Sequence, residues 1–209
     1  MKYIIMCGGH SPERHLVEIN GEPLVARTIR FLRQSGVNDI YISTNSDRFS
    51  HFGVPTIQPE VIEKKEWIDG AFPVLDEPTC YIFGDVMFSP AAIQIIVETE
   101  TDDVEFFASA PPFGALYRKS WAEPFGFKVV NYEHFAESIE KAQELYRTGK
   151  LKRLISWELW QVIKGTQLHV IDYTSYTRIN DYTCDIDDEK DAEDAQNLIA
   201  RYRSIRRKH

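Results

Sequence analysis

The apolar positions along the chain alternate between short runs of strand length and longer stretches with helical spacing. The first apolar run covers residues 3–6, a segment rich in turn residues follows at 7–13, and residues 24–32 predict a helix. Gly36 follows that helix as a stop signal, and residues 40–42 predict the next strand. This order indicates a strand, helix, strand unit whose two strands pair in parallel.

A second unit of the same kind lies in the middle of the chain. Residues 80–83 predict a buried strand, and Asp85 follows its end. A serine N-cap at Ser89, followed by proline at the first helical position, predicts a helix that runs through about residue 98. Another strand is predicted over residues 104–110, so strands and helices continue to alternate.

The last third of the chain begins with an aromatic, proline-bearing segment at residues 111–127, and a helical insertion is expected at about 132–165. The helices and strands expected after residue 127 are 134–147, 156–163, 168–172 and 183–186. A final helix follows, with acidic residues in its first turn and basic residues at its end, as the helix dipole prefers.

The alternation predicts one α/β domain over residues 1–209. We expect a three-layer, Rossmann-like architecture with a mixed, mostly parallel sheet, because parallel strands need helical crossovers. Sheets of this kind bind ligands beyond the carboxyl ends of their strands. The strand ends are therefore the first place to look for functional residues.

Composition limits the choice of partner and compartment. The chain has 209 residues, of which 43% are hydrophobic, enough for a continuous core. Its formal net charge of -8 argues against a nucleic acid or an anionic membrane as partner. No apolar run approaches the roughly 20 residues needed to cross a bilayer, and glycines interrupt the first apolar run too early for a signal peptide. We expect a cytoplasmic protein.

Cysteines do not indicate a disulfide framework or a zinc site. Cys7, Cys80 and Cys184 are odd in number, far apart and without a paired spacing. We expect reduced thiols.

Three strand ends carry residues that suit phosphate chemistry. Gly8 and Gly9 end the first strand, Asp85 ends a central one, and Asp187 ends the last. Glycines let backbone N–H groups approach a phosphate, and two carboxylates can hold Mg²⁺ against it. Taken singly these signals are weak, because Gly-Gly turns and aspartates at helix starts are common structural features. Their occurrence together favours a site for phosphate and Mg²⁺ at these strand ends.

The sequence also resembles a known family. Residues 6–9 and 12–24 resemble the opening of the nucleotidyltransferases that make activated sugars, alcohols and cofactors, and the segment Asn-Gly-Glu-Pro-Leu-Val-Ala-Arg-Thr-Ile at 20–29 matches closely. Gly84-Asp85 resembles the family's metal aspartate after the central strand. The closing Asp-Ile-Asp at 185–187 resembles the segment with the second metal ligand, which would be Asp187.

The resemblance implies a fold shared with A-type glycosyltransferases, Mg²⁺ as cofactor, and transfer of a nucleotidyl group from an NTP to a phosphorylated acceptor with release of pyrophosphate. It makes Asp85 and Asp187 the metal ligands and assigns them, with Arg14, to catalysis. The nucleotide-binding residues that it implies are Cys7, Gly8, Gly9, Arg14, Asp69 and Gly70.

Two departures from the family pattern concern the phosphate loop. The segment between Gly9 and Arg14 is shorter than usual and lacks the Gly-x-Arg element, and arginine stands at position 14 where the family has lysine. His15 and Lys128 could supply further cationic contacts, or they could be solvated surface residues. Asp187 also competes for its role with Asp185 and Asp188, and with a plain N-cap.

The sequence alone does not decide the nucleotide, the acceptor or the choice between three functions. CTP or UTP is the favoured nucleotide and a sugar phosphate a typical acceptor, and a homodimer is a further expectation. An A-type glycosyltransferase is one alternative, although Asp85 is followed by Val86 and Met87 and not by the Asp-x-Asp of that class. A non-catalytic nucleotide-binding protein is the other, motivated by the short loop.

Overall fold

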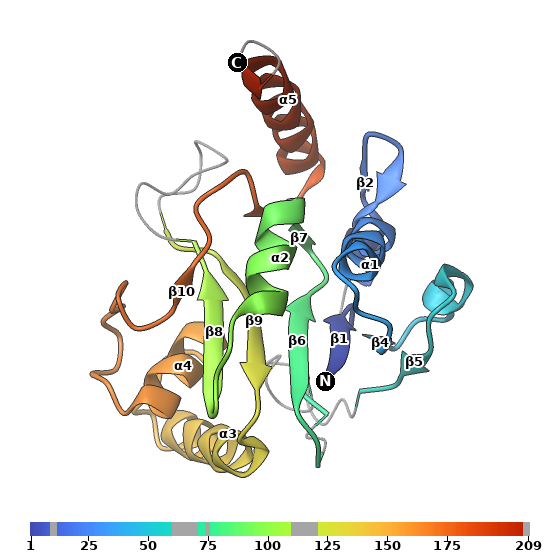
Figure 1. Cartoon of the computed structure of the whole chain (residues 1–209). Helices are drawn as coiled ribbons and strands as arrows, with labels where there is room; N and C mark the ends of the chain where they lie inside the picture. The colour runs from blue at the N-terminus through green and yellow to red at the C-terminus, as the bar shows by residue number, and fades with distance from the viewer. Residues whose placement is uncertain (9–11, 60–70, 74–75, 110–120, 207–209) are drawn as a thin grey trace.

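A seven-stranded sheet forms the centre of the computed structural model, which describes the chain except for residues 9–11, 60–70, 74–75, 110–120 and 207–209 (Figure 1). The strand order is β10-β8-β9-β6-β1-β4-β5. The strands are β1 (Lys2–Met6), β4 (Ile40–Ser43), β5 (Thr56–Ile57), β6 (Thr79–Phe83), β8 (Val104–Ala108), β9 (Pro124–Val129) and β10 (Thr177–Arg178).

The pairing is mixed and mostly parallel, as the sequence predicts. β1 lies between β4 and β6 and is parallel to both. β5 is parallel to β4, and β10 is parallel to β8. β9 is antiparallel to both of its neighbours, β6 and β8. The carboxyl ends of β1 and β6 therefore meet at the same edge of the sheet.

Helices cover the two faces of this sheet. They are α1 (Leu24–Gln34), α2 (Pro90–Glu98), α3 (Tyr132–Arg147) and α4 (Ser156–Lys164). Another helix, α5 (Glu189–Arg206), extends beyond the end of the sheet (Figure 1), and η1 (Pro12–Leu16) and η2 (Asp47–Phe52) are short 3-10 helices. α1 packs beside α2, and α3 beside α4. The N-cap predicted for α2 is confirmed, because the Ser89 hydroxyl accepts a hydrogen bond from the Ala92 N–H. No helix in the described ranges is long and apolar enough to cross a membrane.

Two small antiparallel pairs lie outside the main sheet. The hairpin of β2 (Glu18–Ile19) and β3 (Glu22–Pro23) turns at Asn20 and Gly21, both of which have positive φ. β7 (Val86–Met87) pairs with β11 (Cys184–Asp185). The second pair joins the segment after β6 to the start of α5, more than 90 residues later in the sequence.

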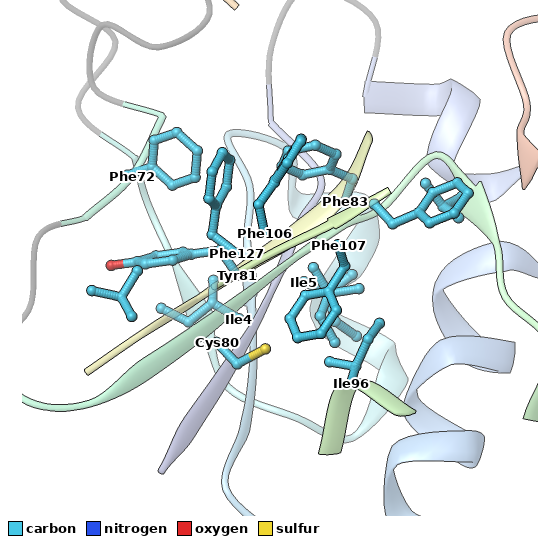
Figure 2. Close-up of a cluster of buried hydrophobic side chains, with 14 of the residues drawn as sticks. Ile4, Ile5, Phe72, Cys80, Tyr81, Phe83, Ile96, Phe106, Phe107 and Phe127 are labelled. Carbon is cyan, nitrogen blue, oxygen red and sulfur yellow. The ribbon is translucent and has the colours of Figure 1, made fainter. Parts of the chain in front are cut away.

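Alternating side chains of the central strands build a separate apolar layer on each face of the sheet (Figure 2). Phe106 and Phe127 lie on one face, where the Phe106 ring meets the rings of Trp157 and Trp160 from α4. Phe107 lies on the opposite face. The α2 residue Ile96 is on that side, so the sheet is the middle layer of three.

Two predicted elements differ in the structure. The segment at 111–127 contains the start of β9, which the pattern does not predict because nearly every residue of that strand is buried and polar alternation is absent. Residues 168–172 do not form a strand. The Gln161 side chain bonds the His169 N–H and the Val170 carbonyl, so these backbone groups are satisfied without a neighbouring strand, and the edge strand is β10 instead.

Candidate functional site

The candidate site forms where β1 and β6 end side by side. Met6 is the register partner of Phe83, and the Gly84 N–H donates to the Met6 carbonyl at 3.0 Å. The segments that follow, with Gly8 after β1 and Asp85 after β6, therefore leave the sheet together. The ends of the first strand and of the central strand are therefore neighbours.

Gly84 allows these two segments to approach closely. A Cβ atom at this position would lie 2.5 Å from the Cys7 Sγ atom and 2.6 Å from the Met6 carbonyl oxygen. Real Cβ atoms do not come this close to sulfur or backbone oxygen, so a side chain would force the strand ends apart. Glycine is required here by space and not by φ.

Arg14 is held next to Asp85 by the short helix η1. Its Nη2 atom lies 2.6 Å from the Asp85 Oδ2 atom, so the predicted catalytic cation and the predicted metal ligand form an ion pair. The Asp85 side chain is 15% exposed and the Arg14 side chain 45% exposed. The carboxylate is thus largely enclosed, whereas the guanidinium reaches it from the solvent side.

His15 lies beneath this ion pair and not on the surface. Its imidazole is buried, with Nε2 3.4 Å from the Gly8 carbonyl oxygen, and its Nδ1 atom is buried without a hydrogen-bond partner. Burial lowers the pKa of His15; the nearby Arg14 also lowers it, while Asp85 acts in the opposite direction. A neutral imidazole therefore fills the space between the two strand ends, and a solvated role for His15 is wrong.

Cys7 lies on the buried side of the site, directly after β1. Its thiol is buried, and burial raises the pKa of that thiol well above its ordinary value. Its N–H donates to the Ser43 carbonyl at 2.7 Å, and its carbonyl accepts from the Thr44 hydroxyl at 3.1 Å. Gly8 is the next residue and is half-buried. Gly9, Asp69 and Gly70, which are predicted nucleotide contacts, lie outside the described residues.

Asp187 reaches the same region by the pairing of β7 with β11. The Ile186 N–H donates to the Asp85 carbonyl at 2.9 Å, so Asp187 is the residue directly after a backbone contact with Asp85. The α5 N-cap is Asp188, whose Oδ1 accepts from the Asp191 N–H, while the Asp191 carboxylate accepts from the Asp187 N–H. The exposed Asp187 carboxylate is thus not the N-cap.

Lys128 lies at the opposite end of the sheet, where it pairs in register with Cys80 near the start of β6. Its Nζ atom donates to the carbonyls of Val97 and Thr99 at the end of α2, at 3.1 and 2.6 Å. Both expectations for Lys128, a phosphate contact and a solvated surface residue, are wrong. It is a buried cation that completes a helix C-terminus.

Glu123 is a buried carboxylate near β11 that the sequence pattern does not single out. It precedes β9, and its Oε2 atom accepts from the Asp185 N–H at 3.3 Å. Its backbone is tied to Ser109 in both directions, which places it at the end of β8. A glutamate before proline inside an aromatic segment is the only sequence signal, and it is not specific.

The rim, the name used here for Gly8, Arg14, Asp85 and Asp187 beyond the strand ends, suits Mg²⁺ better than a metal ion that needs protein ligands on all sides. Among the described residues there is no group of three or more histidine, cysteine or acidic side chains that could hold a metal. Mg²⁺ is usually held by one or two carboxylates and completed by water and substrate phosphates. The Asp85 carboxylate forms an ion pair with the Arg14 guanidinium, so its position is one that suits a bound positive charge.

Comparison with known proteins gives matches in structure but not in sequence families. No protein-family model and no curated protein sequence matches the chain. A Bacillus anthracis structure described as a glucose-1-phosphate thymidylyltransferase in complex with sucrose aligns with a TM-score of 0.54 and 16% identity, over 95% of this chain and 94% of that one.

A second match is 4-diphosphocytidyl-2C-methyl-D-erythritol synthase from Anaerococcus prevotii. It aligns with a TM-score of 0.57 and 13% identity, over 95% of this chain and 97% of that one. Both neighbours are nucleotidyltransferases, and both alignments cover nearly the full length of each chain. The fold of this chain, from β1 to α5, is therefore the Rossmann-like fold found in these nucleotidyltransferases.

Proposed function

We propose that this protein is a magnesium-dependent nucleotidyltransferase that transfers an NMP group from an NTP to a phosphorylated small molecule and releases pyrophosphate. One observation carries the proposal: the adjacent ends of β1 and β6 bring Gly8, Arg14 and Asp85 to one rim. The hydrogen bond from the Ile186 N–H to the Asp85 carbonyl supports the inclusion of Asp187 in this site. The fold of the two structural neighbours supports the assignment.

In this proposal each residue has a separate task. The Gly8 backbone contacts the nucleotide without a Cβ in the way. The Arg14 fork binds oxygens of the α-phosphate as charge develops there, and Asp85 and Asp187 hold the metal. Mg²⁺ would supply charge neutralisation between the acceptor phosphate and the NTP when bound.

A general base is not needed in this reaction. The acceptor phosphate is a dianion near neutral pH and is already a nucleophile, so the rate enhancement comes from in-line positioning and from charge neutralisation. The buried, neutral His15 is consistent with that view, because it is enclosed beneath the site and is not placed as a solvent-facing proton carrier. The nucleotide proposed first is CTP or UTP, and the acceptor class proposed first is sugar phosphates.

The test is a pyrophosphate-release assay with CTP, UTP, GTP and ATP against a panel of sugar and alcohol phosphates. Asp85→Asn and Asp187→Asn should each lower kcat/KM by roughly 100-fold or more, since each removes a charge used in the transition state. Asp39→Asn is the matched control, because Asp39 is an exposed carboxylate just before β4, at the amino end of the sheet. Wild-type turnover in both rim variants would refute the metal assignment.

The two alternatives predict different results when nucleotide-sugars are added to the panel and nucleotide binding is followed by thermal shift. Consumption of a nucleotide-sugar without pyrophosphate release would identify an A-type glycosyltransferase. Saturable NTP binding by thermal shift, with no turnover across the whole panel, would identify a non-catalytic nucleotide-binding protein. Each outcome replaces the proposed function with a different, defined function.

A further inference from the structure

The contact between Arg14 and Asp85 gives the arginine a second role beyond phosphate binding. We propose that Arg14 occupies the cation position on Asp85 when no nucleotide is bound, and that it leaves this position for the phosphates of an incoming nucleotide. The divalent cation then enters only together with the nucleotide. The inference rests on Asp85 being the metal ligand of the proposed function.

The first argument is the need of Asp85 for a positive partner. The carboxylate is only 15% exposed, and the buried side chains of Cys7 and His15 lie close enough to it for their pKa values to respond to its charge. A carboxylate that is partly withdrawn from water is costly to leave without a counter-charge. A cation therefore belongs on Asp85 both before and after ligand binding.

The second argument is the geometry of the present partner. The Arg14 Nη2 atom contacts Asp85 Oδ2 at 2.6 Å, a short contact between opposite charges. A divalent cation bound to that oxygen would lie about 2.1 Å away, so the two cations compete for one place. Binding of the metal alone would also leave a guanidinium next to a doubly charged ion.

The third argument is the freedom of Arg14 to move. Its backbone belongs to η1, whose last turn is closed by a hydrogen bond from the Val17 N–H to the Arg14 carbonyl at 3.3 Å. Its side chain is 45% exposed and reaches Asp85 from the solvent side. A change of side-chain rotamer can therefore transfer the guanidinium to a phosphate without a change in the fold. Arginine suits this exchange because its planar fork matches the oxygens of both carboxylates and phosphates.

These points make cation and nucleotide binding mutually dependent. A triphosphate gives Arg14 a new anionic partner and at the same time completes the oxygen ligands of the metal. By linkage, whatever favours one of these events favours the other to the same extent. The exchange explains why a two-carboxylate rim does not need to bind metal in the empty site.

The test measures metal binding in the absence of nucleotide, so it does not depend on catalytic activity. Mn²⁺ is titrated into wild type, Arg14→Gln, Arg14→Lys and the double variant Arg14→Gln/Asp85→Asn. The loss of the EPR signal of free Mn²⁺ measures how much metal is bound. We expect weak binding to wild type, a gain in affinity of at least about tenfold in Arg14→Gln, and loss of this gain in the double variant. Arg14→Lys keeps a cation at position 14 and should resemble wild type.

Arg48→Gln is the matched control. Arg48 is an exposed arginine that pairs with Glu13 at 3.8 Å, so its loss changes the local charge equally without touching Asp85. Circular dichroism and melting temperature establish that each variant is folded. The proposal is overturned if Arg14→Gln binds Mn²⁺ no tighter than wild type, if Arg48→Gln gains as much, or if the gain persists in the double variant. If the transferase assay shows no turnover but Arg14→Gln binds Mn²⁺ more tightly than wild type, the proposed function is rejected. The proposed exchange of Arg14 for the metal ion on Asp85 is then kept.

Discussion

Gly84 is the residue on which the geometry of the rim depends most directly. It lies between the last residue of β6 and Asp85, and its missing side chain leaves room for Cys7 and for the Met6 carbonyl. The sequence shows a glycine before an aspartate, which is typical of many turns. Its real function, to let two neighbouring strand ends touch, depends on which strand lies beside β6.

Replacement of Gly84 by alanine should destabilise the protein by about 1–3 kcal/mol, because the added methyl group overlaps a buried sulfur and a backbone oxygen that cannot move freely. Urea denaturation measures the change. Gly8→Ala is the control, since its Cβ would meet its nearest neighbour, Pro59 Cγ, at 3.4 Å. It should cost less than about 1 kcal/mol. Equal losses in the two variants would contradict the steric explanation.

The residues of the site differ in how much the sequence could predict about their position and environment. Arg14, Asp85 and Asp187 were predicted from their position in a motif, and the structure places the first two in contact. The neutral, buried state of His15 was not predictable, because a histidine that follows a glutamate and an arginine gives no sign of burial. Its environment comes from Gly8 and Gly84, which follow two different strands.

At the scale of elements, the end of α2 is completed by a side chain from another element. Lys128 of β9 reaches the carbonyls of Val97 and Thr99, which the helix itself cannot satisfy. Burial lowers the pKa of Lys128, while the nearby Cys80 and Glu100 act in the opposite direction. The helix and the strand are therefore coupled through one cation.

Lys128→Met should destabilise the protein by about 1–3 kcal/mol, because two carbonyl groups at the end of α2 lose their donor inside the protein. The measurement is the midpoint of thermal or urea unfolding. Lys141→Met, at an exposed position of α3, removes the same charge and should change stability by less than about 0.5 kcal/mol. A neutral result for Lys128→Met would show that the cation does not stabilise the helix end.

At the scale of the whole molecule, the stability should depend on pH in the range where histidine titrates. The pKa of His15 is lowered by folding from its ordinary value of 6.5, so the unfolded chain binds a proton that the folded chain resists. The stability contributed by neutral His15 is complete above about pH 6.5. It is lost as the pH falls below that value, down to the lowered pKa of the folded state.

Unfolding free energies measured from pH 8 to pH 5 test this dependence. Wild type should lose stability below pH 6.5 with an additional slope of up to about 1.4 kcal/mol per pH unit, the limit for one proton. His15→Gln should lack that additional slope, whatever its absolute stability. His51→Gln, at an exposed histidine, is the control and should retain it. Parallel curves for wild type and His15→Gln would show that His15 is not the group responsible.

The sequence by itself determined most of the local elements of this protein, with β9 and the edge strand as exceptions, and the residue types at its strand ends. Caps, apolar spacing and turn residues act over a few positions, so they predict the α2 start at Ser89 and the alternation of strands and helices. The tertiary structure alone decided which of these residues meet. The contact between Ile186 and Asp85, and the close approach of Gly84 to Cys7, join segments that are distant in sequence, and only strand order and packing bring such segments together.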